Sequence, residues 1–236
     1  MDTDTGIESR TIKSILYARK TNGLYSSLVT GARGAGKSSY SIQVLYRVFR
    51  ALGYSQEEAW KMAIDRCLYK IPEIVTFLEK AGTNEHKDIF IWDDAGVFAG
   101  GVRWLTNQHE MVLIESICDT LRDSLYGILF TVPDVRTLSR RLRNYDDYII
   151  SINYLNDKKQ KELLKTTDVN DIRTVREARV YKKRILPSSA VRIYKEYYDS
   201  FDVMLPDWVY QEYKKKRHRY SQENIKQLKK HLRKQE

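Results

Sequence analysis

The sequence predicts an α/β protein built on a mainly parallel β-sheet, and three observations lead to this prediction. Apolar runs of strand length occur at 88–92 and 126–132, as expected of strands that are buried on both faces, and a further strand is expected at 148–155. Segments with helical periodicity separate these runs, and strands that alternate with helices favour a parallel sheet. With 236 residues, of which 42% are hydrophobic, the chain can bury the core of one sizeable domain.

Periodicity and turn residues place the remaining elements. A first strand is expected over 24–30 and a short one over 67–70, and the expected helices cover 7–20, 38–52, 55–64, 72–82, 106–125 and 135–144. Ser55 with Glu58 three residues later forms a capping-box pattern that opens a helix. Gly53 is a suitable residue to end the preceding helix, because glycine readily adopts the left-handed conformation found there.

The pattern changes after residue 155. Two strand-like segments, 178–186 and 190–198, flank the turn residues Pro-Ser-Ser and predict a β-hairpin, which we place at a sheet edge because its charge is dense. The last 32 residues contain ten Lys and Arg against four Asp and Glu, and they predict a basic helical tail. We therefore expect three parts: a core with an N-terminal helix at 1–155, an extension with the hairpin at 156–204, and the tail at 205–236.

A glycine-rich loop with the sequence GARGAGKS comes after the first strand and fits the phosphate-binding pattern G-x-x-x-x-G-K-[ST]. Glycine permits the left-handed backbone by which consecutive N–H groups wrap a phosphate chain, and the next helix favours anions at its N-terminus. Lys37 is expected to reach the β- and γ-phosphates, and Ser38 to ligate Mg²⁺. The residues expected to hold the nucleotide are Gly31, Ala32, Arg33, Gly34, Ala35, Gly36, Lys37, Ser38 and Ser39. The alternative is a flexible turn without a ligand.

Two aspartates end the apolar strand at 88–92. We expect Asp93 to hold Mg²⁺, directly or through water, and Asp94 to act as the general base that activates a water molecule. Thr131, at the end of a later strand, is expected to face the γ-phosphate and this water. The alternatives are an ordinary strand-to-loop turn for the aspartates and an ordinary strand-end residue for Thr131.

The helix expected at 135–144 places Arg136, Arg140 and Arg143 on one face. An arginine of one subunit could neutralise charge on a neighbouring subunit's nucleotide during phosphoryl transfer, and Arg140 and Arg143 are the candidates. Contact with DNA phosphates and an ordinary solvated face are the alternatives.

The charge distribution points to a polyanionic partner. The net charge is +10, much of it in the tail, and such asymmetry favours nucleic acid. The tail residues expected to contact DNA are Lys214, Lys215, Lys216, Arg217, Arg219, Lys229 and Lys230. A solvated helix without a partner is the alternative. The chain has no apolar run long enough to span a membrane and no secretory signal, and two distant cysteines, so we expect a cytoplasmic protein.

Together, the glycine loop, the strand ending in two acids and the later strand ending in a polar residue resemble P-loop ATPases that carry an additional strand between the two Walker strands. This group includes AAA+ proteins and FtsK/HerA translocases, and the resemblance covers about residues 20–155. It implies a sheet of order 5-1-4-3-2, flanked by helices, in which the strand of Thr131 lies between those next to Lys37 and Asp93.

Finer features of this resemblance point in different directions. An aspartate as the second acid is similar to DnaA initiators and DnaC-type loaders, and the segment 131–144 looks like the DnaA segment that leads to its arginine-finger helix. It departs from that pattern at Tyr145, which occupies the finger position. The hairpin is instead similar to the FtsK/HerA side. The whole chain resembles small predicted ATPases of crenarchaeal viruses and plasmids, such as those of the Sulfolobus spindle-shaped viruses.

From these features we expect an ATP- and Mg²⁺-dependent ATPase that acts on DNA. The main expectation is an oligomer that works in replication initiation or helicase loading with a helicase or other replication protein, in the host cytoplasm if the chain is viral. The alternatives are a DNA-translocating or packaging motor, an ATP-dependent binding switch with little turnover, and a small-molecule kinase.

Overall fold

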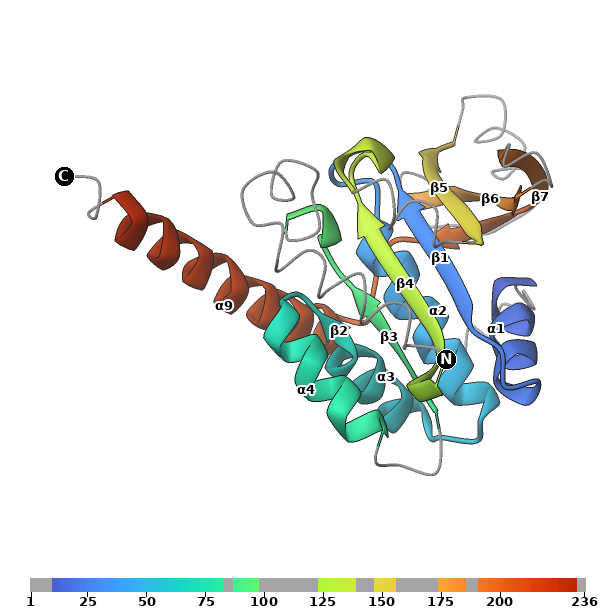
Figure 1. Cartoon of the computed structure of the whole chain (residues 1–236), viewed down its shortest axis with the longest axis horizontal. Coiled ribbons are helices and arrows are strands. Elements are labelled where there is room, and N and C mark those ends of the chain that lie inside the picture. The colour runs from blue at the N-terminus through green and yellow to red at the C-terminus, as the bar shows by residue number, and fades with distance from the viewer. Residues whose placement is uncertain are drawn as a thin grey trace. The chain divides into compact units, whose positions relative to one another are not determined.

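A computed structural model describes residues 10–82, 87–97, 123–138, 147–155, 174–185 and 191–232. The chain divides into two compact units, Met1–Met204 and Leu205–Glu236. The strands, all in the first unit, are β1 (Tyr25–Thr30), β2 (Cys67–Leu68), β3 (Asp88–Trp92), β4 (Leu125–Val132), β5 (Tyr148–Tyr154), β6 (Val175–Ile185) and β7 (Val191–Asp202) (Figure 1). The described helices of this unit are α1 (Arg10–Lys20), α2 (Lys37–Ala51), α3 (Gln56–Asp65), α4 (Ile71–Gly82) and the 3₁₀ turns η1 (Ala95–Val97) and η2 (Val135–Thr137). The second unit contains α9 (Asp207–Leu232).

The seven strands form one sheet in the order β2-β3-β4-β1-β5-β6-β7. Strands β1 to β5 pair in parallel, whereas β6 and β7 are antiparallel. The expected α/β fold with a mostly parallel sheet is therefore confirmed. The complete sheet differs from the expected five-stranded order, because the hairpin pairs with β5 and extends the sheet to seven strands. Strand β4 lies between β1 and β3, which brings their carboxyl ends to a common edge.

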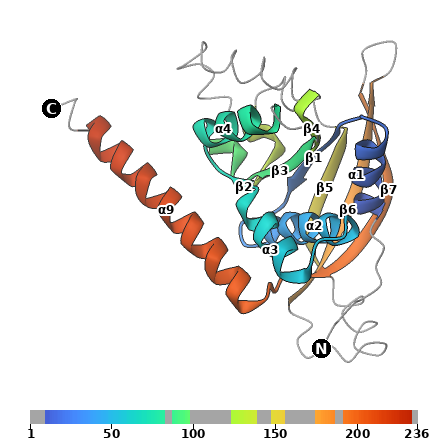
Figure 2. The same cartoon turned by 90° about the horizontal axis from the view of Figure 1, so that it is seen from below.

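The central strands are the most buried part of the sheet. All eight residues of β4 are buried, as are the first five of β1. Helices α1 and α2 both contact these two strands. Helices α2 and α3 lie side by side (Figure 2) and are joined by stacked rings of Tyr46 and Trp60, whose centroids are 3.8 Å apart. Helix α2 is thereby packed between the central strands and α3.

Two helix ends lie where the sequence predicts them. Ser55 and Glu58 form the reciprocal capping box at the start of α3. Gly53 comes just after α2 with a φ of 95°, and its N–H donates to the carbonyl of Arg50. No described helix is both long and apolar enough to cross a lipid bilayer.

Two helix boundaries differ from the prediction. Leu125, expected at the end of a long helix, is the first residue of β4; Asp123 and Ser124 are helical, and the rest of that predicted helix lies outside the described residues. The basic helix expected at 135–144 is wrong at its start, because η2 ends at Thr137 and Leu138 is extended. The side chain of Asp134 caps this single turn.

The tail differs in a similar way. Ser221 is of a residue type that often caps the start of a helix, but α9 runs without a break from Asp207 through this residue. Its first turn closes where the N–H of Tyr210 donates to the carbonyl of Pro206, 2.9 Å away. The segment between contains no glycine or proline, so nothing interrupts the helix and the hydroxyl of Ser221 has no helix start to cap.

Candidate functional site

The glycine-rich loop connects β1 to α2 and adopts the backbone that its glycines permit. Gly31, Gly34 and Gly36 have φ values of 150°, 78° and 97°, all of which are strained for residues with a side chain. Crowding adds to this requirement: a Cβ at Gly31 would lie 2.6 Å from the carbonyl oxygen of Ile152, and one at Gly36 would collide with the side chain of Val203. The loop is therefore shaped by its own backbone and by two distant segments of the chain.

Lys37 is the first residue of α2, and its side chain folds back over the loop. The Nζ atom donates hydrogen bonds to the carbonyl oxygens of Gly31 and Ala32, each at 2.9 Å. Only 9% of the residue is exposed. This conformation holds the ammonium beside the first turn of α2, whose N–H groups carry positive partial charge. Both features favour a phosphate at this place.

Asp93 lies at the carboxyl end of β3 and is completely buried. Its Oδ1 atom accepts a hydrogen bond from the Ser38 hydroxyl at 2.8 Å and another from the Thr131 hydroxyl at 2.5 Å. These donors offset part of the cost of burying a carboxylate. The three side chains come from the ends of β3 and β4 and from the start of α2, as the sheet order requires.

Asp94 is the next residue and is partly exposed. Its N–H donates to the Thr131 hydroxyl at 3.0 Å. Its φ is 53°, a left-handed conformation that is uncommon for residues other than glycine but that Asp and Asn tolerate best. Thr131 thus fixes both aspartates: it donates to the carboxylate of Asp93 and accepts from the backbone of Asp94.

The residues present fit a magnesium ion. Ser38 and Asp93 supply two oxygen atoms within one hydrogen bond of each other. Magnesium prefers oxygen ligands, and it commonly takes one or two from the protein and the others from substrate phosphates and water. In the described part of the chain, no three His, Cys, Asp or Glu side chains meet to form a metal site on their own.

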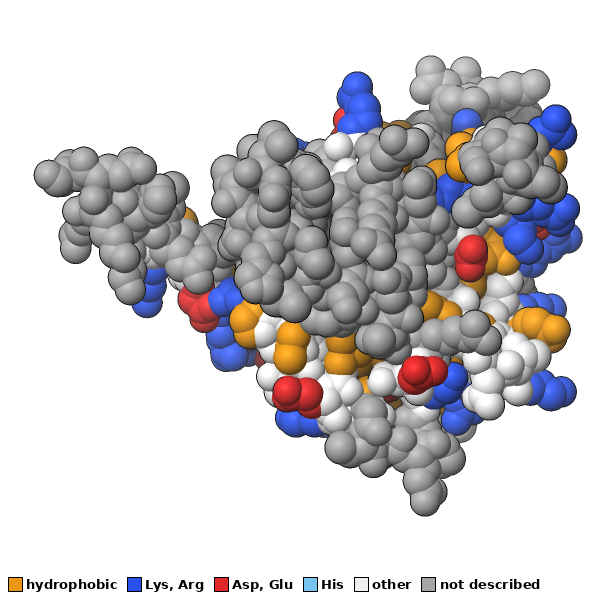
Figure 3. Space-filling view, in the orientation of Figure 1, with side chains coloured by type: hydrophobic (Ala, Val, Ile, Leu, Met, Phe, Trp, Pro, Cys, Tyr) orange, Lys and Arg blue, Asp and Glu red, His pale blue; other side chains and the backbone are white. Residues whose placement is uncertain are grey.

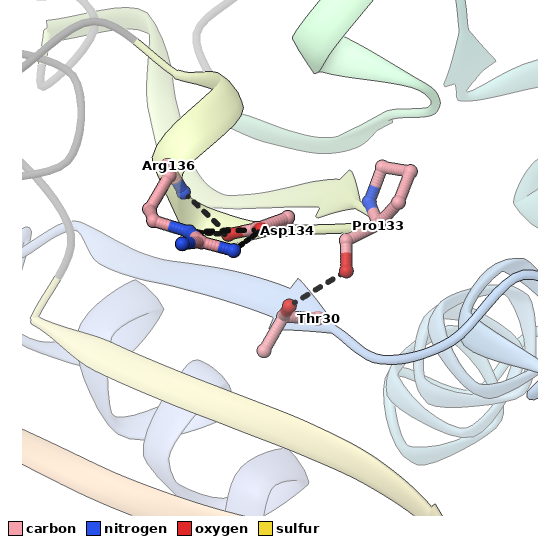
Figure 4. Close-up of polar contacts among 4 residues, drawn as sticks. All are labelled: Thr30, Pro133, Asp134 and Arg136. Carbon is pink, nitrogen blue, oxygen red and sulfur yellow. Dashed lines mark hydrogen bonds and ion pairs between the residues drawn. The ribbon is translucent and has the colours of Figure 1, made fainter.

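Arg136 is not directed at the two aspartates. Figure 4 shows its guanidinium against the carboxylate of Asp134, with a Nη2–Oδ2 distance of 2.6 Å. These hydrogen bonds lower the pKa of Asp134 to about 2. Beside this pair, the Thr30 hydroxyl donates to the carbonyl of Pro133 at 3.4 Å, which links the ends of β1 and β4. Arg140 and Arg143 lie outside the described residues.

The structure also places a segment near the loop that local sequence patterns could not have identified. At the end of β7, the ring of Phe201 packs edge-on against Tyr40 of α2, with centroids 5.0 Å apart. The Gln43 side chain donates to the carbonyl of Asp202 at 2.5 Å, and Val203 lies against Gly36. The hairpin is thereby attached to the glycine loop and its helix, a contact between segments far apart in sequence.

The tail cations form a separate group in the second unit. Lys214, Lys215, Arg217, Arg219 and Lys229 are exposed and Lys216 is half-buried, whereas the side chain of Lys230 lies outside the described part. Lys215 pairs with Glu212 at 2.7 Å, and Arg217 donates to the Tyr213 hydroxyl at 3.3 Å. The expected cations are thus carried on one helix.

Comparison with known proteins gives viral relatives. No family model matches the chain. Over 218 residues it is 28% identical to the uncharacterized protein B-251 of Sulfolobus spindle-shape virus 1, and the match covers 91% of this chain and 82% of that protein.

Among solved structures, the chain is similar to B204, the DNA-packaging ATPase of Sulfolobus Turreted Icosahedral Virus, with 13% identity and a TM-score of 0.42 over 72% of this chain and 97% of that one. It is also similar to the genome packaging NTPase B204 of Sulfolobus turreted icosahedral virus 2 in complex with ATP-gammaS, with 14% identity and a TM-score of 0.42 over 73% and 97% of the two chains.

Proposed function

We propose that this chain is a Mg²⁺-dependent ATPase that acts on DNA as a translocating or packaging motor. The convergence of Lys37, Ser38, Asp93 and Thr131 at the ends of adjacent elements carries the proposal. An ammonium, a hydroxyl and a buried carboxylate beside a helix N-terminus are the groups that positioning and charge stabilisation of a triphosphate require.

In this proposal each residue has a defined task. The backbone N–H groups of the glycine loop and the ammonium of Lys37 hold the phosphates. Ser38 and Asp93 hold Mg²⁺, which when bound neutralises charge on the β- and γ-phosphates. The carboxylate of Asp94 accepts a proton from the attacking water. Thr131 positions both aspartates through its two hydrogen bonds.

The motor is favoured over the other candidates by the hairpin of β6 and β7. This antiparallel pair lies beside β5 and extends the sheet, and a hairpin in this part of the chain is the feature similar to FtsK/HerA translocases. Genome packaging is the activity named for the B204 proteins of the two icosahedral viruses. The expected role in replication initiation or helicase loading receives no support from the described residues or from the comparisons.

The proposal includes DNA as partner and a homo-oligomer as the working form. Arg140 and Arg143 remain candidates for contacts with the nucleotide of a neighbouring subunit. In such an assembly, hydrolysis would depend on contacts between copies of the chain, and protein concentration would change the turnover per subunit.

The test is ATP turnover with and without linear duplex DNA, combined with displacement of a triplex-forming oligonucleotide from that duplex. A motor is stimulated by the duplex and displaces the third strand only when ATP is hydrolysed. Turnover that duplex DNA leaves unchanged, together with ATP-dependent assembly, would contradict the motor and favour a binding switch.

A further inference from the structure

We propose that the outer part of the β6–β7 hairpin, residues 179–185 and 191–195, binds the phosphate backbone of DNA. This inference rests on the proposed function, because it assigns a DNA contact to a protein proposed to act on DNA. It is independent of the basic tail, which belongs to the other unit.

The charges of the hairpin are separated along its length. The outer segments contain six Lys and Arg and no Asp or Glu. The acidic residues of β7 all lie nearer its end, at Glu196, Asp199 and Asp202. In Figure 3, Lys and Arg side chains gather on the side of the molecule where Figure 1 places β6 and β7. This separation gives the outer part an excess of positive charge, which favours contact with a polyanion. Of its six cations, Arg179 pairs with Glu177 at 2.6 Å, and Asp147, just before β5, lies near Lys182 and Lys183.

Residues 179–182 of the outer part pair with β5, and its tip extends past the rest of the sheet. Pairing of β5 with β6 ends at Tyr148 and Lys182, whereas β6 and β7 continue to pair up to Ile185 and Val191. The other end of the hairpin is the one attached to the glycine loop, where Val203 meets Gly36. A ligand on the outer part would therefore lie away from the nucleotide and still be joined to it by two continuous strands.

Cations of the hairpin lie beside exposed aromatic rings on both of its faces: Arg184, Arg192 and Tyr194 share one face, and Lys195 lies on the other. The guanidinium of Arg184 lies 5.6 Å from the ring centre of Tyr194, and the ammonium of Lys195 lies 5.7 Å from that of Tyr198. Tyr194 is 40% exposed and Tyr198 is 58% exposed. A ring beneath a cation holds it in place while leaving its N–H groups available to phosphate oxygens. The rings themselves offer flat surfaces to sugars or bases.

An exposed edge strand can also pair with a second copy of the chain. The charges of this edge argue against that occupant, because two copies would bring Arg192 and Lys195 close to the same cations of the partner. Like charges directly opposite one another destabilise strand pairing. A phosphate backbone, by contrast, neutralises them.

The test compares two triple variants of the full chain that carry the same change in net charge. One is Arg184→Gln, Arg192→Gln and Lys195→Gln in the hairpin. The control is Lys20→Gln, Arg50→Gln and Lys61→Gln, three exposed cations of α1, α2 and α3. Binding to a duplex oligonucleotide is measured at several salt concentrations, together with DNA-independent ATP turnover and sedimentation.

In a plot of log K against log salt, the slope for the hairpin variant should be less steep than that of the wild type by about 2 to 3, since each lost duplex contact reduces it by roughly 0.9. The control should keep the wild-type slope, and both variants should keep the DNA-independent turnover. Single-stranded DNA in place of the duplex should show a smaller change, about 0.7 per contact; a larger one would overturn the duplex as the ligand.

Equal slopes for wild type and hairpin variant would overturn the inference while leaving the ATPase and the motor intact. The same holds if the hairpin variant changes only the sedimenting mass, since the edge would then join copies of the chain. If the wild-type protein itself fails to bind DNA, the proposed function fails first, so the two failures are distinguishable.

Discussion

Thr131 joins the parts of the candidate site. Its hydroxyl donates to the buried carboxylate of Asp93 and accepts from the N–H of Asp94, so one small side chain holds the carboxylate of one aspartate and the backbone of the next. Its position is set by β4, whose register opposite β1 places Thr131 beside Val29. Of the two strands that flank β4, β3 leads to Asp93 and β1 leads to the loop that precedes Lys37 and Ser38.

We expect Thr131→Val to lower both stability and ATP turnover. The substitution keeps the shape but removes one donor to a buried carboxylate, which costs about 1–3 kcal/mol. Chemical denaturation measures the first effect and a steady-state ATPase assay the second. Thr131→Ser, which retains the hydroxyl, is the matched control and should keep most of the activity. Equal activity of the Val and wild-type proteins would remove Thr131 from the site.

Asp94→Asn separates binding of the nucleotide from its hydrolysis. Asn tolerates the left-handed backbone at this position, so the loop should keep its shape. The amide cannot accept a proton, and loss of a general base typically costs about 10²- to 10⁴-fold in rate. Affinity for ATP, measured with a fluorescent analogue, should stay near that of the wild type. Hydrolysis at the wild-type rate would show that another group activates the water.

At the scale of elements, a cluster of three hydroxyl groups connects α1, α2 and β7. The Thr11 hydroxyl lies 3.2 Å from that of Tyr40 and 2.7 Å from that of Tyr197. Burial raises the pKa of both tyrosines well above the usual value, so both keep their protons at neutral pH. The cluster joins the N-terminal helix to the hairpin and to the helix that begins at Lys37.

Thr11→Val should destabilise the protein by about 1–3 kcal/mol, because the buried hydroxyl of Tyr40 loses a partner. Combining Thr11→Val with Tyr40→Phe and Tyr197→Phe also removes the two tyrosine hydroxyls that would otherwise lose their partner. This triple variant should therefore be more stable than the sum of the separate changes predicts. Urea denaturation of all the variants provides the comparison. Strict additivity would mean that the three hydroxyl groups do not act as a unit.

At the scale of the whole molecule, positive charge gathers in the hairpin and in the tail. If about five tail cations contact phosphates, deleting residues 214–236 should flatten the salt dependence of duplex binding by about 4 to 5. DNA-independent ATP turnover should change little, because the candidate site lies in the other unit. Titrations of the full and shortened chains at several salt concentrations measure this. Identical slopes would assign the tail's charge to solvation or to another partner.

Features that depend on neighbouring residues can be predicted from the sequence, whereas contacts between segments far apart in the chain cannot. The left-handed glycine backbone between β1 and α2 and the capping box at Ser55 are local features and were predicted correctly. The contact of Val203 with Gly36 joins the hairpin to the loop and has no local signal. Ser221 shows the opposite case, in which a local capping signal is overridden by a continuous helix.

The central claim is ATP hydrolysis at the glycine loop, and turnover by Lys37→Ala tests it most directly. The substitution removes the ammonium that the loop carbonyls hold in place and leaves the phosphate charge of the transition state uncompensated. The wild type should hydrolyse ATP in a Mg²⁺-dependent manner, and the variant should show no turnover above background while its circular dichroism and melting curve match a folded protein. Wild-type turnover by the folded variant would contradict the account.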